Sequence, residues 1–231
     1  MRRTSTIPDG DERTANGRRR ARREPLTRER IAEAAMRIMD AEGLEAVTMR
    51  RVGRELGVEA MSLYGHVRDK EEILSGIIEA VMAEFEFPED HPDWREAGRR
   101  TARAWRALLK AHPNVMTLMS HQRKPMTSLV ALRPTEHALA ILRRAGLSEE
   151  ETVRAFRAFG GYIQGFVLAE IANMFGGDVQ VDPEDLATLP LDELPELASH
   201  LEFLFHCDQD AEFGYGLDLM LRGLEARAAS A

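Results

Sequence analysis

From residue 26 onward, apolar side chains recur at helical spacing, and this periodicity constrains the fold more than any other feature of the sequence. The first stripe consists of Ile31, Ala34, Ala35 and Ile38, and a longer stripe runs over residues 73–85. No run of alternating, β-branched residues typical of a strand interrupts the pattern. The sequence therefore predicts an all-α fold of about nine or ten helices.

Residues that begin and end helices divide this pattern into segments. The predicted N-caps, whose side-chain oxygens can accept a backbone N–H, are Thr27, Thr48, Asp69 and Ser148. The predicted helix ends are at the glycines Gly43, Gly57 and Gly146. Pro125 and Pro134 are expected to bracket a loop. The later helices are expected over about 135–145, 149–175, 191–205 and 211–227.

Length and composition narrow the possible classes of protein. A chain of 231 residues is long enough for a sizeable core. Its single cysteine excludes an internal disulfide, a CxxC redox pair and a cysteine-based zinc finger. No apolar run reaches the roughly 20 residues that a membrane span needs, and no apolar run of a secretory signal follows the Arg-rich N-terminus. We therefore expect a cytoplasmic protein.

Charge is distributed unevenly along the chain. Residues 1–70 contain 16 Lys and Arg against 12 Asp and Glu, a net charge of +4, so the total of −8 leaves −12 for the remainder. This asymmetry predicts an N-terminal module that attracts anions, carried on an acidic body. Residues 1–25 are expected to form a disordered arm with an arginine cluster at 18–23. That arm either keeps the chain soluble or contacts DNA phosphates.

The segment 48–70, TMRRVGRELGVEAMSLYGHVRDK, carries the clearest functional signal. Two short helices separated by Gly57 are typical of a helix-turn-helix, because glycine enters a tight turn without a clash at Cβ. The alternative is an ordinary helical hairpin with a solvated face. A solvated face favours Glu and Lys, whereas the outward positions here hold small, hydroxyl-bearing and aromatic side chains. Such side chains suit the major groove of DNA.

Residues 26–74 resemble the DNA-binding domain of the TetR/AcrR family of transcriptional regulators, above all in the run LGVEAMSLYGHVRDKEEIL. In the body, LRPTE at 132–136 and GLDLMLRGLE at 216–225 are similar to segments of the tetracycline repressor subfamily. The resemblance covers most of residues 26–227. It implies a regulator and not an enzyme, with a DNA-binding domain at 26–72 and a ligand-binding and dimerisation domain at 73–231.

The resemblance also implies which side chains contact double-stranded DNA. These are Thr48, Met49, Arg50, Ala60, Met61, Ser62, Tyr64, Gly65, His66 and Lys70. Those at 60–62 match base-reading positions, and Arg50 is the candidate for a guanine contact. The family's phosphate-contacting positions correspond to Thr48, Tyr64, His66 and Lys70. Because Ala60 and Gly65 replace a glutamine and a tryptophan of the tetracycline repressor subfamily, we expect a different operator sequence.

The helices that enclose the family's ligand cavity supply the candidate effector-binding residues. These are Phe85, Thr101, Trp105, Met116, Met119, His121, Tyr162, Gln164 and Phe166. Methionine and aromatic side chains suit an adaptable apolar ligand, although each of them could instead fill the core. The subfamily's metal-holding histidine has no counterpart at 129–132, and no HxH or HExxH spacing occurs. We therefore expect an apolar effector and neither a metal nor another cofactor.

Two predicted helices, 149–175 and 211–227, carry more apolar surface than a monomer would cover, together with several glycines that permit close helix approach. We expect a homodimer through a four-helix bundle that binds a palindromic operator, with the helix at 69–86 as the lever that ligand binding moves. Two alternatives stay open. An all-α enzyme or carrier requires an acid–base or metal constellation, and a constitutive DNA-binding protein without an effector requires a filled core.

Overall fold

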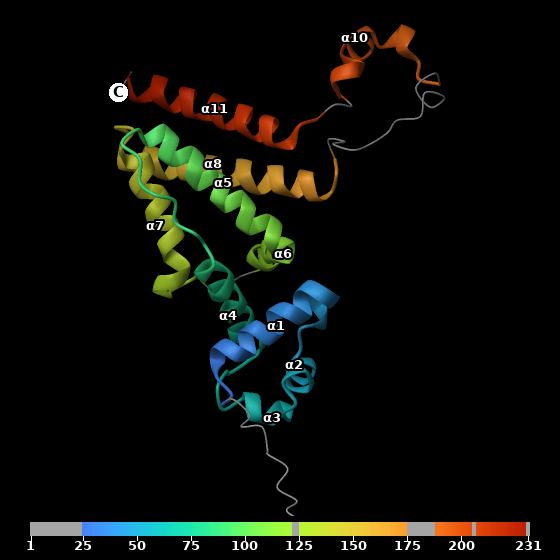
Figure 1. Ribbon diagram of the computed structural model, residues 1–231, viewed down its shortest axis with the longest axis vertical. Helices are drawn as coiled ribbons and strands as arrows, with labels where there is room; N and C mark the ends of the chain where they lie inside the picture. Colours follow the sequence, from blue (N-terminus) through green and yellow to red (C-terminus); the bar gives the residue numbers. More distant parts are fainter. Residues whose placement is uncertain (1–24, 122–124, 175–187, 205–206, 230–231) are drawn as a thin grey trace, which may run out of the picture.

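The computed structural model describes residues 25–121, 125–174, 188–204 and 207–229, and the regular structure in these ranges is helical throughout (Figure 1). The prediction of an all-α fold is confirmed. The α-helices are α1 (Arg28–Glu42), α2 (Met49–Leu56), α3 (Ala60–Leu63), α4 (Lys70–Ala83), α5 (Trp94–Ala111), α6 (Pro113–His121), α7 (Leu129–Arg143), α8 (Glu149–Ile171), α10 (Pro195–Leu204) and α11 (Gln209–Ala228). Two short 3₁₀ helices are η1 (Leu44–Ala46) and η2 (Leu191–Glu193).

Helices α1, α2 and α3 pack into a small unit at one end of the molecule, which we call the head (Figure 1). Its boundaries follow from side-chain and backbone chemistry at the helix ends. The hydroxyl oxygens of Thr27 and Thr48 accept the first free N–H groups of α1 and α2, at 3.2 Å and 3.1 Å. Gly43 and Gly57 end these helices with φ of +87° and +66°, a backbone region that favours glycine. The caps and stops predicted here are confirmed.

Helix α4 connects the head to the rest of the chain (Figure 1). Asp69 caps it by accepting the backbone N–H of Glu72 at 2.8 Å. Gly76 lets α4 approach α1 closely, because a Cβ at this position would lie 3.1 Å from the Cβ of Ala32. One continuous cluster of buried apolar side chains runs from α1 along α4 into the helices beyond. The head is therefore joined to its neighbour through a shared core, and not through a flexible linker.

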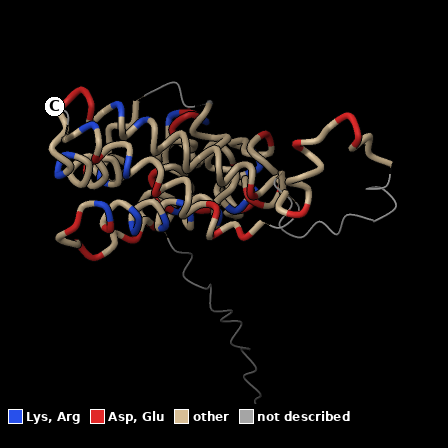
Figure 2. The backbone as a smooth tube through the Cα atoms, turned by 90° about the horizontal axis from the view of Figure 1, so that it is seen from above, with Lys and Arg blue, Asp and Glu red and all other residues tan. Residues whose placement is uncertain are grey.

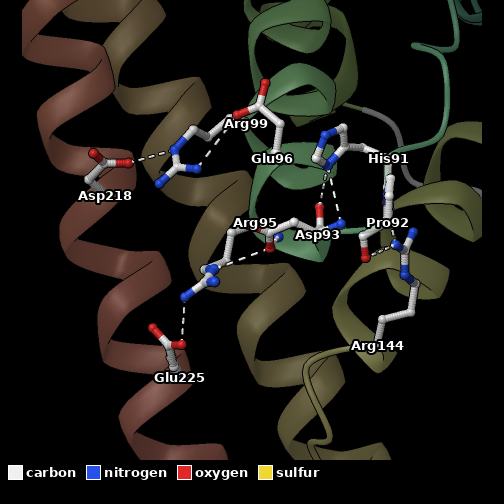
Figure 3. Close-up of polar contacts among 9 residues, drawn as sticks. All are labelled: His91, Pro92, Asp93, Arg95, Glu96, Arg99, Arg144, Asp218 and Glu225. Carbon is white, nitrogen blue, oxygen red and sulfur yellow. Dashed lines mark hydrogen bonds and ion pairs between the residues drawn. The ribbon is translucent and has the colours of Figure 1, made fainter.

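Helices α5, α6, α7, α8 and α11 form the second unit, which we call the body (Figure 1). Ion pairs fix the N-terminal half of α5 against α11 (Figure 3). Arg95 binds Glu225 at 2.5 Å, and Arg99 binds Asp218 at 2.7 Å. From the other side, Arg144 hydrogen-bonds the loop that precedes α5. The start of α5 is thus held between the end of α7 and the C-terminal half of α11.

A buried charged cluster closes the opposite end of the body. Arg106 makes two hydrogen bonds to the carboxylate of Glu170, at 2.8 Å and 2.9 Å, and Lys110 approaches the same carboxylate at 2.5 Å. The guanidinium also lies over the rings of Phe166 and Phe213, 5.5 Å and 4.9 Å from their centroids. Burial opposes ionisation of Glu170, but the hydrogen bonds from both cations outweigh it and hold its pKa below the usual range.

Three predicted helix boundaries are wrong. Pro134 does not precede a helix but lies in the second turn of α7, which begins at Leu129, about six residues before the predicted start, because Ser128 caps it. The proline removes one backbone hydrogen bond, while its ring is buried against the body core. Pro195 separates the predicted helix at 191–205 into η2 and α10. Helix α8 ends at Ile171, four residues before the predicted end at 175.

The segment 188–204, with η2 and α10, lies apart from the body (Figure 1). It carries acidic side chains and no basic ones (Figure 2). Phe203 and Leu204 near its end are 73% and 53% exposed. Within the described ranges, no helix combines the length and the apolar character that crossing a membrane requires.

The charged cluster generates a stability prediction. Arg106→Met is expected to lower the free energy of unfolding by about 3–5 kcal/mol, because Glu170, whose side chain is only 10% exposed, loses two hydrogen bonds and keeps only the half-exposed Lys110 as a counter-ion among the described residues. Adding Glu170→Leu should recover most of this loss, since the poorly compensated carboxylate is then gone. Urea unfolding at a fixed protein concentration measures both effects. A double variant that loses the sum of the two single losses would contradict this account.

Candidate nucleic-acid interface and interior cavity

Glycines set the geometry of the turn between α2 and α3. Gly57 ends α2 in the left-handed conformation. Gly53 is buried inside α2, and a Cβ there would lie 3.0 Å from the carbonyl oxygen of Val58 and 3.2 Å from the backbone nitrogen of Ala60. The sequence analysis singled out Gly57 but missed Gly53. The available signal was a glycine within an eight-residue helix, where glycine costs roughly 1 kcal/mol relative to alanine unless close packing requires it.

Helix α3 is anchored on one face and exposed on the other. Leu63 and, just beyond the helix, Val67 are buried in the head core. Met61 is 74% exposed and Tyr64 is 49% exposed. The other predicted contacts Thr48, Arg50, Ser62, Gly65 and His66 are also exposed, whereas Met49, Ala60 and Lys70 are half-buried. Met49 additionally packs against the core, so its side chain has less freedom to reach a ligand than those around it.

Two adjacent arginines of α2 differ in their surroundings. Arg51 binds Glu42 at 2.6 Å and Glu55 at 2.8 Å. Hydrogen bonds to these two carboxylates raise the pKa of its guanidinium. Arg50 is exposed, and within the described ranges nothing in the head forms an ion pair or hydrogen bond with its side chain. Arg51 therefore stabilises the head through its ion pairs, while Arg50 is available to bind an external partner.

The body contains a partly open cavity of about 350 Å³ between α4, α5, α6, α7, α8 and α11. Aromatic side chains on its wall come from Phe85, Trp94, Trp105, Phe156 and Phe159. The wall also contains three methionines, Met82, Met119 and Met126. Its polar side chains are Thr101, Thr135 and Gln164. No Asp, Glu, Lys, Arg or His belongs to the described wall. This chemistry suits an apolar organic molecule.

Both parts of the chain match models of known protein families. Residues 31–77 match "Bacterial regulatory proteins, tetR family", and residues 87–228 match "Tetracyclin repressor-like, C-terminal domain". The chain belongs to the TetR family of transcriptional regulators. This is a family of regulators and not of enzymes, so the identification made from the sequence is confirmed.

Individual relatives cover nearly the whole TetR-family chain. It is 35% identical to the transcriptional repressor DrrR1 of Streptomyces coeruleorubidus, over 92% of this chain and 83% of the relative. It is 28% identical to the class C tetracycline repressor of Escherichia coli, over 87% and 91%. Among solved structures, ActR of Streptomyces coelicolor in complex with actinorhodin superposes with a TM-score of 0.74 at 29% identity, covering 89% of this chain and 99% of ActR.

The structure places the sequence-predicted effector residues of this TetR-family chain in two groups. The cavity wall includes Phe85, Thr101, Trp105, Met119 and Gln164. It does not include Met116, which packs against the core, or Tyr162 and Phe166, which stack around Phe213 on the opposite side of α8. His121 ends α6, and its side chain lies outside the described residues. Helical periodicity identified α8 but did not establish which of its faces points inward.

Sequence reasoning missed His137. Its Nε2 lies 3.1 Å from the hydroxyl oxygen of the wall residue Thr101, and its ring packs edge-on against Phe85 and Phe87. Burial lowers the pKa of His137, against the opposing effect of the Asp90 charge. The available signal was spacing, because His137 follows the wall residue Pro134 by three positions on the same helix face.

The described residues contain no cluster of three or more His, Cys, Asp or Glu side chains that could hold a metal ion. Glu170 of α8 follows the buried residue Ala169. Its carboxylate binds Arg106 and Lys110 and does not belong to the cavity wall.

The contrast between the two arginines is testable. Arg50→Ala is expected to weaken binding to a selected DNA site by about 1–3 kcal/mol and to relax selectivity at one base pair, because a guanine contact is lost. Arg51→Ala should lower the melting temperature of the head and leave base selectivity unchanged. Fluorescence anisotropy with single-base variants of the site measures the first effect, and thermal unfolding measures the second. Equal relaxation of selectivity in both variants would contradict the assignment.

The His137 environment predicts a pH dependence. Because the pKa in the folded state lies below the usual 6.5, the unfolded chain binds this proton first, and the free energy of unfolding should fall as the pH drops through about 6.5 and below. His137→Gln should remove this component. Urea unfolding of both proteins between about pH 7.5 and 5.5 separates the contribution of His137 from that of the other histidines. If the free energy of unfolding changes with pH equally in the two proteins, His137 makes no such contribution.

Proposed function

We propose that this TetR-family chain is a homodimeric repressor of the bacterial cytoplasm, which binds a palindromic operator and releases it when an apolar small molecule fills the cavity. One observation carries the proposal. Helix α4 contributes Ile73 and Ile77 to the core shared with the head, and Met82 near its C-terminal end and Phe85 just beyond it belong to the cavity wall. A ligand that displaces Phe85 or Met82 therefore acts on the helix that supports the head.

Exposure and charge of the head support DNA as its partner. The outward face of α3 and the turn after it present Met61, Ser62, Tyr64 and His66, and Arg50 is exposed on the neighbouring α2. In a two-fold dimer, two such helices read major-groove segments about 34–36 Å apart. We propose that residues 26–72 are the DNA-binding domain and 73–231 the ligand-binding and dimerisation domain. The predicted arm at 1–25 lies almost wholly outside the described residues.

The matched relatives support both halves of the proposal. DrrR1 and the class C tetracycline repressor are repressors by name, and ActR was solved with the small molecule actinorhodin bound. An open, uncharged cavity also favours a ligand-responsive regulator over a constitutive DNA-binding protein, for which we expected a filled core.

Uncovered apolar surface supports the homodimer. On α8, Leu168 is 60% exposed; on α11, Tyr215 is 66% and Leu219 is 54% exposed. Among the glycines of the same two helices, Gly161 and Gly165 have open space where a Cβ would stand. These residues form a stripe across two helices that lie side by side (Figure 1). A second copy would cover it as a four-helix bundle with close helix contacts.

A second route between body and head runs through the corner between α5 and α6. His112 Nε2 lies 2.8 Å from a carboxylate oxygen of Glu84 at the end of α4. The Asn114 side chain donates to the carbonyl of Met39 in α1 at 3.1 Å. His112 Nδ1 is buried without a hydrogen-bond partner, 4.0 Å from Asp40. Movement of this corner would therefore change contacts with α1 and α4 together.

Selection of bound sites from random DNA tests the proposed function. We expect an inverted repeat whose half-sites are centred about one helical turn apart, or a multiple of it. Tyr64→Ala and Lys70→Ala should both reduce retention of the selected site, and Lys70→Ala should also flatten its salt dependence, because a cationic phosphate contact releases counter-ions whereas an uncharged one does not. Failure to enrich any sequence, or enrichment of a site without symmetry, would contradict the proposal.

The dimer has its own test. Leu219→Asp is expected to raise the dimer dissociation constant by about 30-fold or more, since removal of a central apolar contact costs about 2 kcal/mol or more. Met61→Asp, an equally drastic change on the exposed head, should leave the dimer intact. Sedimentation velocity over a dilution series measures both constants. A wild-type chain that stays monomeric at micromolar concentration refutes the proposal.

A further inference from the structure

We propose that the cavity takes an uncharged aromatic compound bearing a hydroxyl group, and that Thr101 and His137 form the polar subsite that selects this hydroxyl. The inference rests on the proposed function only in taking the cavity as the effector site. It concerns the chemical class of the ligand, which the family membership leaves open.

The aromatic side chains of the wall favour an aromatic ligand. Rings from α5 and α8 and from the end of α4 surround the space, among them Trp94, Trp105 and Phe159. Phe85 and Trp105 already pack edge-on, with centroids 5.7 Å apart. Aromatic rings interact well with other rings through such edge and offset contacts. A volume of about 350 Å³ is at the small end of ligand cavities, and it fits two or three fused rings better than a larger molecule.

The charge state of the wall excludes ionised ligands. No side chain of the described wall carries a formal charge. The body has a buried cation, Arg106, but it forms ion pairs with Glu170 and Asp210 and does not belong to the wall. A carboxylate or ammonium group entering the cavity would lose its hydration without gaining a counter-ion. The bound compound is therefore neutral.

The polar subsite favours a hydroxyl group, which can pair with Thr101 in either tautomer of His137. Thr101 belongs to the wall, and its hydroxyl oxygen lies 3.1 Å from Nε2 of His137. A threonine hydroxyl donates one hydrogen bond and accepts two, and the pair with His137 uses one of these. If Nε2 carries the proton, Thr101 can still donate to a ligand; if Nε2 accepts, Thr101 can still accept. A ligand hydroxyl satisfies either arrangement, because it can donate and accept.

The other polar residues of the wall do not offer the same site. Gln164 is exposed, so water satisfies its amide in the absence of a ligand. Thr135 is half-buried and makes no side-chain hydrogen bond within the described residues. The Thr101 hydroxyl, by contrast, is held in place by His137, so its side chain loses less conformational entropy when a ligand binds. Thr135 provides a matched control for it.

Three probes of nearly equal shape test the inference: naphthol, naphthalene and naphthoate. Isothermal titration calorimetry gives their dissociation constants. The chain has two tryptophans, and both belong to the cavity wall, so a change in tryptophan emission locates the bound probe. We expect naphthol to bind about 3- to 10-fold more tightly than naphthalene, as one net hydrogen bond predicts. Naphthoate should bind more weakly than both.

Variants assign the preference to the subsite. Thr101→Val should abolish the preference for naphthol over naphthalene while naphthalene still binds, which shows that the cavity is intact. Thr101→Ser and Thr135→Val should both keep the preference. The inference is overturned if naphthalene or naphthoate binds as tightly as naphthol, if Thr101→Val keeps the preference, or if none of the probes binds.

Operator release is measured separately on the same samples. If naphthol binds with the expected preference but leaves operator retention unchanged at saturation, release by cavity occupancy fails as a function for this ligand class, and the subsite stands. If operator release occurs without the hydroxyl preference, the proposed function stands and the subsite is refuted. The two proposals can therefore fail independently.

Discussion

The close packing of α4 on α1 is the contact on which the rest of the structure depends. Gly76 brings the two helices to a distance at which a single added methyl group would lie 3.1 Å from the Cβ of Ala32. Ile73 and Ile77 of α4 are fully buried in the same core as Ile31 and Ile38 of α1. Because such interiors are packed at crystal-like density, α4 cannot shift without the head responding. A helix that ended at this interface would only hold the head in place, whereas α4 continues to the wall of an internal cavity.

This continuity gives a physical route from ligand to DNA. A ligand shifts an equilibrium only as far as it binds one conformation better than the other, and coupling energies of about 1–3 kcal/mol are typical between such sites. Phe85 and Met82 supply the differential contacts on one side of α4, and the corner at His112 and Asn114 supplies a parallel set of contacts to α1 and α4. The TetR family membership establishes a transcriptional regulator; the geometry of α4 explains how a small cavity can control it.

Local sequence signals predicted this architecture well where one residue decides the outcome. Thr27, Thr48, Asp69 and Ser148 all cap helices by accepting a backbone N–H, as predicted. The exception is Pro134, which was expected to precede a helix and instead lies inside α7. A proline costs one helical hydrogen bond, and here the ring gains burial against the cavity, a tertiary contribution that no local pattern reveals.

The candidate site could be predicted only in part, because its residues are brought together by helix packing. Tyr162 and Phe166 were expected in the cavity, yet they stack with Phe213 around a buried arginine, since α8 is apolar on several faces and its rotation is set by its neighbours. His137 went unnoticed because its role depends on Thr101, which is 36 positions away in the sequence. Exposed residues of α3 were easier to assign, because surface position depends on periodicity alone.

The distance between the two heads of the proposed dimer tests the central claim most directly. A spin label at exposed Glu45, in a chain whose single cysteine has been changed by Cys207→Ser, reports this distance by pulsed electron paramagnetic resonance. The account predicts that a compound which fills the cavity and releases DNA shifts the distance distribution between the two labels. Release of DNA with an unchanged distribution would contradict it.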